Sequence, residues 1–347
     1  MMDYDKKYTD NIVNTLKQLV SIPSPTGFTV NAAEFIKNEL SEMGFSPAIT
    51  NRGNVLCPLG GNGPGLILAS HFDTLGAMVR SVKPNGRIRI TKIGGLSLGS
   101  VEAENCTVYT YDGNKYTGTL QMNNPSAHVA GPELQDGKRT EDSMEVVLDH
   151  KTSSADDTKK LGIETGNFIA FDPRFVETES GYIKSRFLDD KAGCAILLSF
   201  ARFVKETGIT LNRRIWLLFT CHEEVGTGAA SGLPEADEII SVDMGCVGGD
   251  LSCDETMVSI CVKDAGGPYD MNVVSKLVQV AKKENISYAC DVYPYYGSDA
   301  NAAVSAGYHM RHGCIGPGIY ASHGYERGHR EGFENTLKLI IGYVLAG

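Results

Sequence analysis

The sequence lacks an excess of basic charge. Its 32 Lys and Arg residues are outnumbered by 42 Asp and Glu residues, and the formal net charge is −10. No cluster of Lys and Arg is long enough to form the basic face that binding to a polyanion requires. We therefore expect no nucleic-acid partner.

Long apolar runs are absent as well. The longest, at 195–201 and 337–346, fall well short of the ~20 residues that span a bilayer. The charged start of the chain, residues 1–7, is not followed by the apolar stretch of a secretion signal. We therefore expect no membrane partner.

Paired cysteine motifs are the third absence. The chain has nine cysteines, an odd number, and no Cys-x-x-Cys pair. Cys194, Cys221 and Cys261 lie inside apolar runs, where free thiols behave as small core residues. These features predict a cytoplasmic protein without a disulfide framework.

Length and hydrophobic patterning indicate two domains. The 347 residues, 42% of them hydrophobic, exceed what one ordinary domain needs. Apolar residues recur at helical spacing over 12–20 and 32–43, and residues 66–70 form the continuous apolar run of a buried strand. Beyond Lys184, strand and helix patterns alternate, which predicts a mostly parallel sheet covered by helices. The expected strands there are 214–221, 238–242 and 258–262, and the expected helices are 191–205, 270–283 and 330–345.

Residues 74–181 show a different pattern. Segments rich in β-branched residues alternate with turn residues, and Asp112-Gly113 is a hairpin signal between two of them. We therefore interpret the chain as an α/β catalytic domain, formed by residues 1–73 and 182–347, with an inserted β-rich domain at 74–181.

Several short segments place His, Asp or Glu after a predicted strand or at the start of a helix, where sites form in open α/β sheets. They are 70–73, 188–191, 222–226, 242–245 and, late in the chain, 322–324. Each has an ordinary structural explanation when taken alone. Asp189 and Asp190 could cap a helix, Glu223 and Glu224 could be solvated, and a single His is more often hydrogen-bonded than metal-bound.

Taken together, the segments supply what a dinuclear metallohydrolase needs. Such a site requires a carboxylate shared by two metals, two further ligands for each, and a free carboxylate that takes a proton from the metal-bridging water. Two imidazoles and three carboxylates provide the ligands: His71, Asp189, Glu224, Asp243 and His323. Glu223 is left over as the general base, and Asp73 is placed to orient the imidazole of His71.

These motifs resemble the tetrahedral (TET) aminopeptidases, the glutamyl-aminopeptidase family of dinuclear metallopeptidases. Leu-Asp-Asp-Lys at 188–191 is similar to the family's Leu-Asp-Asp-Arg segment, with Lys191 in place of Arg, and Glu-Glu-Val-Gly at 223–226 matches the family's motif. The segments 16–27, 51–55 and 298–300 are also similar, so the resemblance covers nearly the whole chain. The chain departs from the family at Thr74, where an acidic residue is usual, and at His222.

The resemblance implies a hydrolase that removes the N-terminal residue of peptides. Its expected fold is a mostly parallel mixed sheet flanked by helices, of the zinc-peptidase type, with a small β-barrel as the insertion. The resemblance assigns His71 and Asp243 to one metal, Glu224 and His323 to the other, and Asp189 as the bridge. Spacing alone leaves Asp190 as an alternative bridge.

The resemblance also implies the cofactor and the partners. Two divalent ions per subunit are expected, with zinc first and cobalt or manganese as alternatives. The expected partners are peptide substrates and copies of the same chain, because the family's barrel helps to assemble a hollow twelve-subunit tetrahedron. In the inserted domain we therefore expect a role in oligomerisation or substrate access.

Two other functions compete with this interpretation. A related dinuclear deacylase or carboxypeptidase would use the same ligands, and a catalytically idle scaffold or binding protein could keep the fold. The presence of Glu223 beside five intact ligands argues against the idle protein. The aromatic segment 293–297 could line a substrate cleft or be a packed loop.

Overall fold

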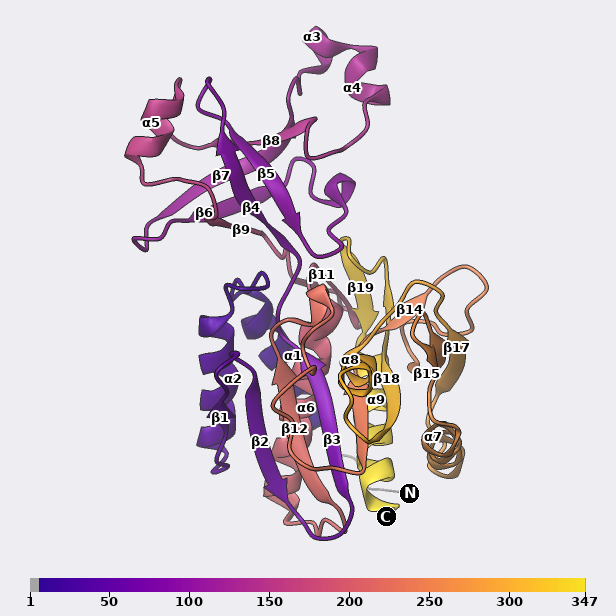
Figure 1. Cartoon of the computed structure of the whole chain (residues 1–347). Coiled ribbons are helices and arrows are strands. Elements are labelled where there is room, and N and C mark those ends of the chain that lie inside the picture. The colour runs from indigo at the N-terminus through magenta and orange to yellow at the C-terminus, as the bar shows by residue number, and fades with distance from the viewer. Residues whose placement is uncertain (1–5, 347) are drawn as a thin grey trace. The chain divides into compact units, whose positions relative to one another are not determined.

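The computed structural model describes residues 6–346 and divides the chain into two compact units (Figure 1). One unit contains residues 1–73 and 174–347, and the other is the segment 74–173. The charged residues 1–5 and the last residue lie outside the described residues. The insertion ends earlier than the turn pattern predicted, because β10 (Val176–Glu177) pairs with β11 (Tyr182–Ser185) in the sheet of the first unit.

A 13-stranded mixed sheet forms the centre of the first unit. Its remaining strands are β1 (Ala48–Ile49), β2 (Val55–Gly60), β3 (Gly65–His71), β12 (Arg214–Thr220), β13 (Glu238–Val242), β14 (Gly245–Val247), β15 (Val258–Asp264), β16 (Gly267–Pro268), β17 (Tyr288–Val292), β18 (Arg311–Tyr320) and β19 (Glu326–His329). The main path runs β1-β2-β12-β3-β13-β18-β19-β11-β10. From β12 to β18 neighbouring strands are parallel, and towards both ends of the path they are antiparallel.

Helices pack on this sheet. They are α1 (Lys7–Val20), α2 (Val30–Glu42), α6 (Leu188–Thr207), α7 (Met271–Lys283), α8 (Asp299–Ser305) and α9 (Arg330–Leu345). α6 and α9 contact each other and lie against β3 and β18, while α1 packs on α6. The helix ends follow local chemistry. The Asp270 carboxylate accepts hydrogen bonds from the first turn of α7, and α6 ends at Gly208 in the left-handed conformation.

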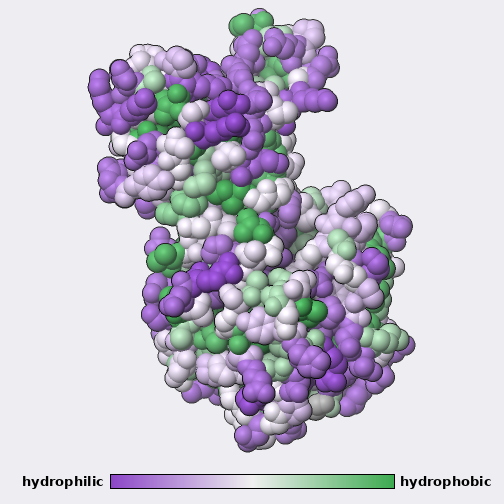
Figure 2. Space-filling model, in the orientation of Figure 1, coloured by the Kyte–Doolittle hydropathy of each residue, from purple (hydrophilic) through white to green (hydrophobic). Residues whose placement is uncertain are grey.

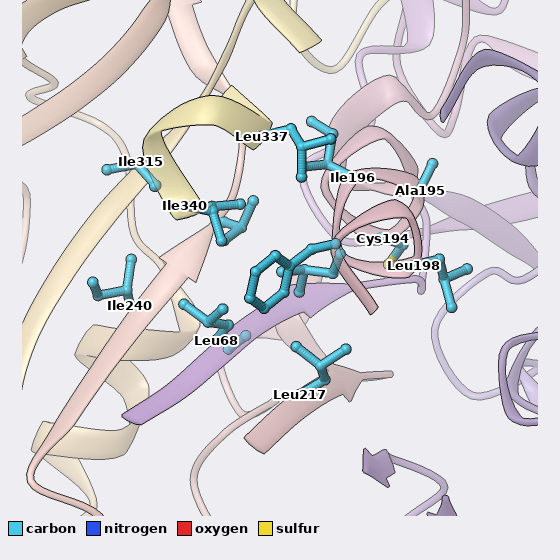
Figure 3. Packing of buried hydrophobic residues seen from close by; sticks show 14 of the residues in the cluster. Leu68, Cys194, Ala195, Ile196, Leu198, Leu217, Ile240, Ile315, Leu337 and Ile340 are labelled. Atoms are coloured by element: carbon cyan, nitrogen blue, oxygen red, sulfur yellow. The ribbon is translucent and has the colours of Figure 1, made fainter. Parts of the chain in front are cut away.

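The core of this unit lies between α6, α9 and the central strands. Figure 3 shows Ile196 of α6, Leu337 and Ile340 of α9 and Leu68 of β3 in one cluster of buried side chains. All positions of β3 are buried, as the continuous apolar run predicted. Full burial of each such Leu or Ile side chain contributes ~1.5–3 kcal/mol, which holds the end of β3 in place.

The second unit is a closed antiparallel barrel with a core of its own. Its strands are β4 (Gly76–Val82), β5 (Ile88–Ile93), β6 (Asn105–Tyr109), β7 (Lys115–Met122), β8 (Met144–Leu148) and β9 (Phe168–Phe171). They close in the order β4-β5-β8-β7-β6-β9. Alternate residues such as Val79, Ile90, Val108 and Val146 are buried inside. Short helices α3 (Ala127–Ala130), α4 (Pro132–Asp136) and α5 (Ala155–Lys160) interrupt the strands. The predicted α/β fold with an inserted small β-barrel is confirmed.

Among residues 6–346, no helix has the length and apolar character needed to cross a bilayer. The face drawn in Figure 2 mixes hydrophilic and hydrophobic residues. Mixed surfaces of this kind are usual once most large apolar side chains lie in a core.

Candidate metal centre

The carboxyl ends of the central strands carry the first part of the site. β3 ends at His71, and its parallel neighbours β12 and β13 end beside it. The chain after each strand supplies a carboxylate: Asp73 after β3, Glu223 after β12 and Asp243 after β13. Since parallel strands end at one edge of a sheet, residues distant in sequence converge there.

His71 lies at the centre of a first triad, with Asp189 and Asp243. Its Nε2 is 3.1 Å from Asp189 Oδ1 and 4.0 Å from Asp243 Oδ2, and 3.8 Å from the Oε2 of Glu223. His71, Asp189 and Asp243 are all buried, and their closest ligand atoms lie within 4.8 Å of one another.

A second triad shares Asp189 with the first. The Nε2 of His323 is 3.6 Å from Asp189 Oδ2 and 3.6 Å from Glu224 Oε2. Its three ligand atoms also lie within 4.8 Å of one another. His323 comes from the loop between β18 and β19, so the second triad combines this loop with α6 and the 3₁₀ turn after β12 (Glu223–Val225).

The chemistry of the two triads fits divalent cations. Imidazole nitrogens and carboxylate oxygens suit zinc, cobalt or manganese, and no thiol belongs to either triad. Within the described part of the chain, the buried Oδ1 of Asp243 has no hydrogen-bond partner. A buried carboxylate oxygen of this kind is costly unless it meets a cation or a donor.

The structure separates the two neighbouring aspartates. Asp189 belongs to both triads. The Asp190 carboxylate is turned into the protein, where it accepts hydrogen bonds from the Ser70 hydroxyl (2.5 Å), the Gly193 N–H (3.1 Å) and the His71 N–H (3.3 Å). Asp189 is therefore the aspartate that both triads share, and Asp190 connects α6 to the end of β3.

Asp73 contacts His71 differently from the expectation. The Nδ1 of His71 lies 3.0 Å from the main-chain oxygen of Asp73, whereas the carboxylate is 3.6 Å away. That carboxylate instead accepts hydrogen bonds from the Glu223 N–H (3.1 Å), the Glu224 N–H (3.4 Å) and the Thr26 hydroxyl (2.6 Å). The carbonyl fixes the imidazole, and the carboxylate fixes the turn that carries both glutamates.

Glu326, which the sequence patterns did not single out, connects the two halves of the site. Its Oε2 accepts hydrogen bonds from the N–H groups of Leu188 (2.7 Å) and Asp189 (3.2 Å), and its Oε1 from the His323 N–H (3.0 Å). The side chain is buried. Its position three residues after His323 is the only local signal that could have pointed to it.

The electrostatics of the site also fit bound cations. Burial, reinforced by neighbouring carboxylates, raises the pKa of Glu223 and Glu224, and it raises the pKa of Asp243 to about 7. Burial opposes protonation of His71, but the hydrogen bond to Asp189 and the charges of Glu223 and Asp243 raise its pKa overall. Carboxylates crowded in this way are relieved when positive charge is placed among them.

The fold and this imidazole–carboxylate centre together fit the class of metal-dependent peptidases. Residues 53–339 match the family model of the M42 glutamyl aminopeptidases. The chain is 43% identical over 332 residues to "Putative aminopeptidase YhfE" of Bacillus subtilis, covering 95% of this chain and 96% of that protein. The chain belongs to the M42 family, and it is a peptide-hydrolysing aminopeptidase.

Solved structures share the fold at low sequence identity. Aminopeptidase APDkam598 from the archaeon Desulfurococcus kamchatkensis has a TM-score of 0.86 at 21% identity, covering 97% of this chain and 95% of that one. The TET1 peptidase of Pyrococcus horikoshii, which can assemble into a tetrahedron or a large octahedral shell, has a TM-score of 0.85 at 20% identity, covering 96% of this chain and 99% of that one. Family membership favours an aminopeptidase over the competing deacylase, carboxypeptidase and idle protein.

Proposed function

We propose that this aminopeptidase cleaves the N-terminal peptide bond at a dinuclear centre, with Glu223 as general base. The observation that carries the proposal is the pair of ligand triads that share Asp189. His71 and Asp243 would hold one divalent ion, and Glu224 and His323 the other. Zinc is the proposed metal, with cobalt or manganese as alternatives.

Two bound cations would polarise the scissile carbonyl and lower the pKa of water in this site. The side chains of the site would position the substrate and the attacking water, and Glu223 would transfer the proton. Glu223 belongs to neither triad, yet its Oε2 lies 3.8 Å from the first imidazole. Burial raises the pKa of this carboxyl, which makes it a better proton acceptor near neutral pH. It would take a proton from the attacking water and pass it to the leaving amine.

The test separates the two neighbouring glutamates. Glu223→Gln keeps the size of the side chain and both triads but cannot accept the proton, so kcat should fall by ~10²–10⁴ with metal content unchanged. Glu224→Gln replaces a charged ligand, so metal content should fall and added metal should restore part of the activity. Activity and bound metal are measured on the same samples.

The exposed Glu34→Gln change on α2 is the matched control and should alter neither quantity. Near-normal turnover of Glu223→Gln would overturn its role as the base. Full metal content in Glu224→Gln would remove Glu224 from the ligand set. We also expect the enzyme to require a free α-amino group on its substrate, and equal cleavage of N-acetylated and free peptides would contradict this.

We also propose that the chain assembles into a closed homo-oligomer of twelve subunits, with the barrel at 74–173 contributing to assembly or substrate access. The support is the fold shared with TET1, which assembles into closed shells. Mass photometry at micromolar concentration should show a particle about twelve times the 37.4 kDa chain. A monomer under those conditions would refute the assembly and leave the catalytic proposal standing.

We also propose that the protein is located in the cytoplasm. All nine cysteines are unpaired, and most are buried. Unpaired thiols in this number fit a reducing compartment. Fractionation of the producing cells should recover the protein with cytoplasmic enzymes, and recovery from the culture medium would contradict it.

A further inference from the structure

A cavity of about 500 Å³ opens beside the two triads, within the first unit. On one side lie His323 and the carboxylates of the metal centre together with Glu223. The remaining wall comes from the segment after β13 and from the aromatic loop before α8. It is formed by Met244, Cys246, Leu251 and the loop 293–297, and Gly226 and Ser322 complete the lining.

The hydroxyl groups of the buried Tyr293 and the half-buried Tyr296 on this wall already have hydrogen-bond partners. The Tyr296 hydroxyl donates a hydrogen bond to the main-chain oxygen of Met244 (2.9 Å), and the Tyr293 hydroxyl pairs with Ser259 Oγ (2.5 Å). These two tyrosines therefore present mainly the apolar faces of their rings to a molecule bound in the cavity. Burial, with nearby Asp189 and Asp243 adding to it, raises the pKa of the Cys246 thiol to about 12, so the thiol is neutral. The wall is therefore apolar in character.

The described lining of the cavity also offers no lysine or arginine to pair with an acidic ligand side chain. Of the residues that the structure describes, no Lys or Arg lines it, and its only carboxylates are those of the metal centre and Glu223. An acidic side chain would lose its hydration there without meeting a protein cation. A basic side chain would compete with the metals for carboxylates that already serve them. Both cases carry the cost of burying an unpaired charge.

We propose that this cavity receives the side chain of the substrate's N-terminal residue and selects an uncharged apolar or aromatic residue, such as Leu, Met or Phe. This inference rests on the proposed function, in which the peptide bond is cleaved at the candidate metal centre that lines one side of this cavity. The proposed preference differs from the one for N-terminal glutamate that the name of the glutamyl aminopeptidase family implies. The selecting residues are Met244, Leu251, Tyr293 and Tyr296.

The test is a profile of kcat/KM over aminoacyl-4-nitroanilides that differ only in the amino acid. Leu, Met and Phe should exceed Glu and Lys by roughly 100-fold or more, the range expected when one side chain fits an apolar pocket and another leaves a charge unpaired. A wild-type enzyme that prefers Glu or Lys would overturn the proposal.

Two variants place a cation on the cavity wall. Leu251→Lys changes a half-buried position, and Tyr295→Lys changes a lining position whose side chain is 99% exposed, so it should leave the fold undisturbed. Each should raise the ratio of Glu to Leu cleavage by at least 10-fold. Val30→Lys, exposed on α2 and outside the cavity, is the control and should leave the ratio unchanged.

The outcomes distinguish the two proposals. An unchanged ratio in both cavity variants would show that selection occurs elsewhere, while loss of activity in Glu223→Gln would keep the mechanism intact. No cleavage of any aminoacyl substrate by metal-loaded wild type would instead refute the proposed function itself.

Discussion

Glu326 offers the sharpest test of how the site is held together. Its carboxylate accepts hydrogen bonds from three main-chain N–H groups, two at the start of α6 and one at His323. Through them it fixes Asp189, which both triads share, relative to His323. Glu326→Gln preserves the shape of the side chain and removes one acceptor oxygen.

The magnitude follows from these contacts. In either orientation of the glutamine amide, its NH₂ faces an N–H donor, so at least one of the three hydrogen bonds is lost. A hydrogen bond to a charged group contributes about 1.5–3 kcal/mol. If most of this free energy is lost from metal binding at the second triad, the dissociation constant of the metal bound there should rise by roughly 10–150-fold.

The assay is a titration of metal-free protein with zinc against a competing chelator, together with kcat and the midpoint of urea unfolding. Glu326→Gln should bind one of two metal equivalents more weakly, and excess metal should recover most of kcat. Glu331→Gln, an exposed position nearby, is the control. Unchanged affinity for both equivalents would refute the positioning role, and so would a loss of activity that metal does not restore.

Two further predictions concern the start of α6. A Cβ at Gly193 would overlap the carbonyl oxygen of Val242 and crowd the Asp190 carboxylate, so Gly193→Ala should lower the free energy of unfolding by about 1–3 kcal/mol. Gly99→Ala, where the Cβ meets open space, should unfold in denaturant close to wild type, and equal midpoints for both variants would contradict this account. Burial lowers the pKa of Lys191 from 10.5 to about 7. Between these pH values the Lys191 amine is therefore protonated in the unfolded chain and neutral in the folded chain, so folding becomes more favourable as the pH rises. Wild type should therefore gain stability relative to Lys191→Met from pH 7 to pH 10 in urea titrations, and a constant difference would show that the buried amine keeps its charge.

Local patterns in the sequence predicted the elements of the catalytic unit well. The predicted strand 238–242 and helix 330–345 have the same bounds as β13 and α9. Hydrophobic periodicity and helix-end residues are local signals, and both elements are buried enough to make them strong. The boundary of the insertion was less accurate because β10 is only two residues long, and its pairing with β11 is not visible in local composition.

The sequence also predicted which residues form the candidate site. His71, Asp189, Glu224, Asp243 and His323 lie just after strands or at the start of a helix, and the order of their motifs resembles one family. The structure brings all five together in two triads. It also places Glu223 beside the first triad and Asp73 under the turn that carries both glutamates.

Only the tertiary structure decided which atoms face the site. Asp189 and Asp190 are adjacent and chemically identical, so their roles depend on the direction in which the backbone presents each carboxylate. Glu326 and the tyrosine wall of the cavity depend on N–H groups and carbonyls from distant segments, which leave no trace in side-chain patterns. Sequence thus determined which chemistry the chain can perform, and the packing of α6 on the sheet decided which of its carboxylates performs it.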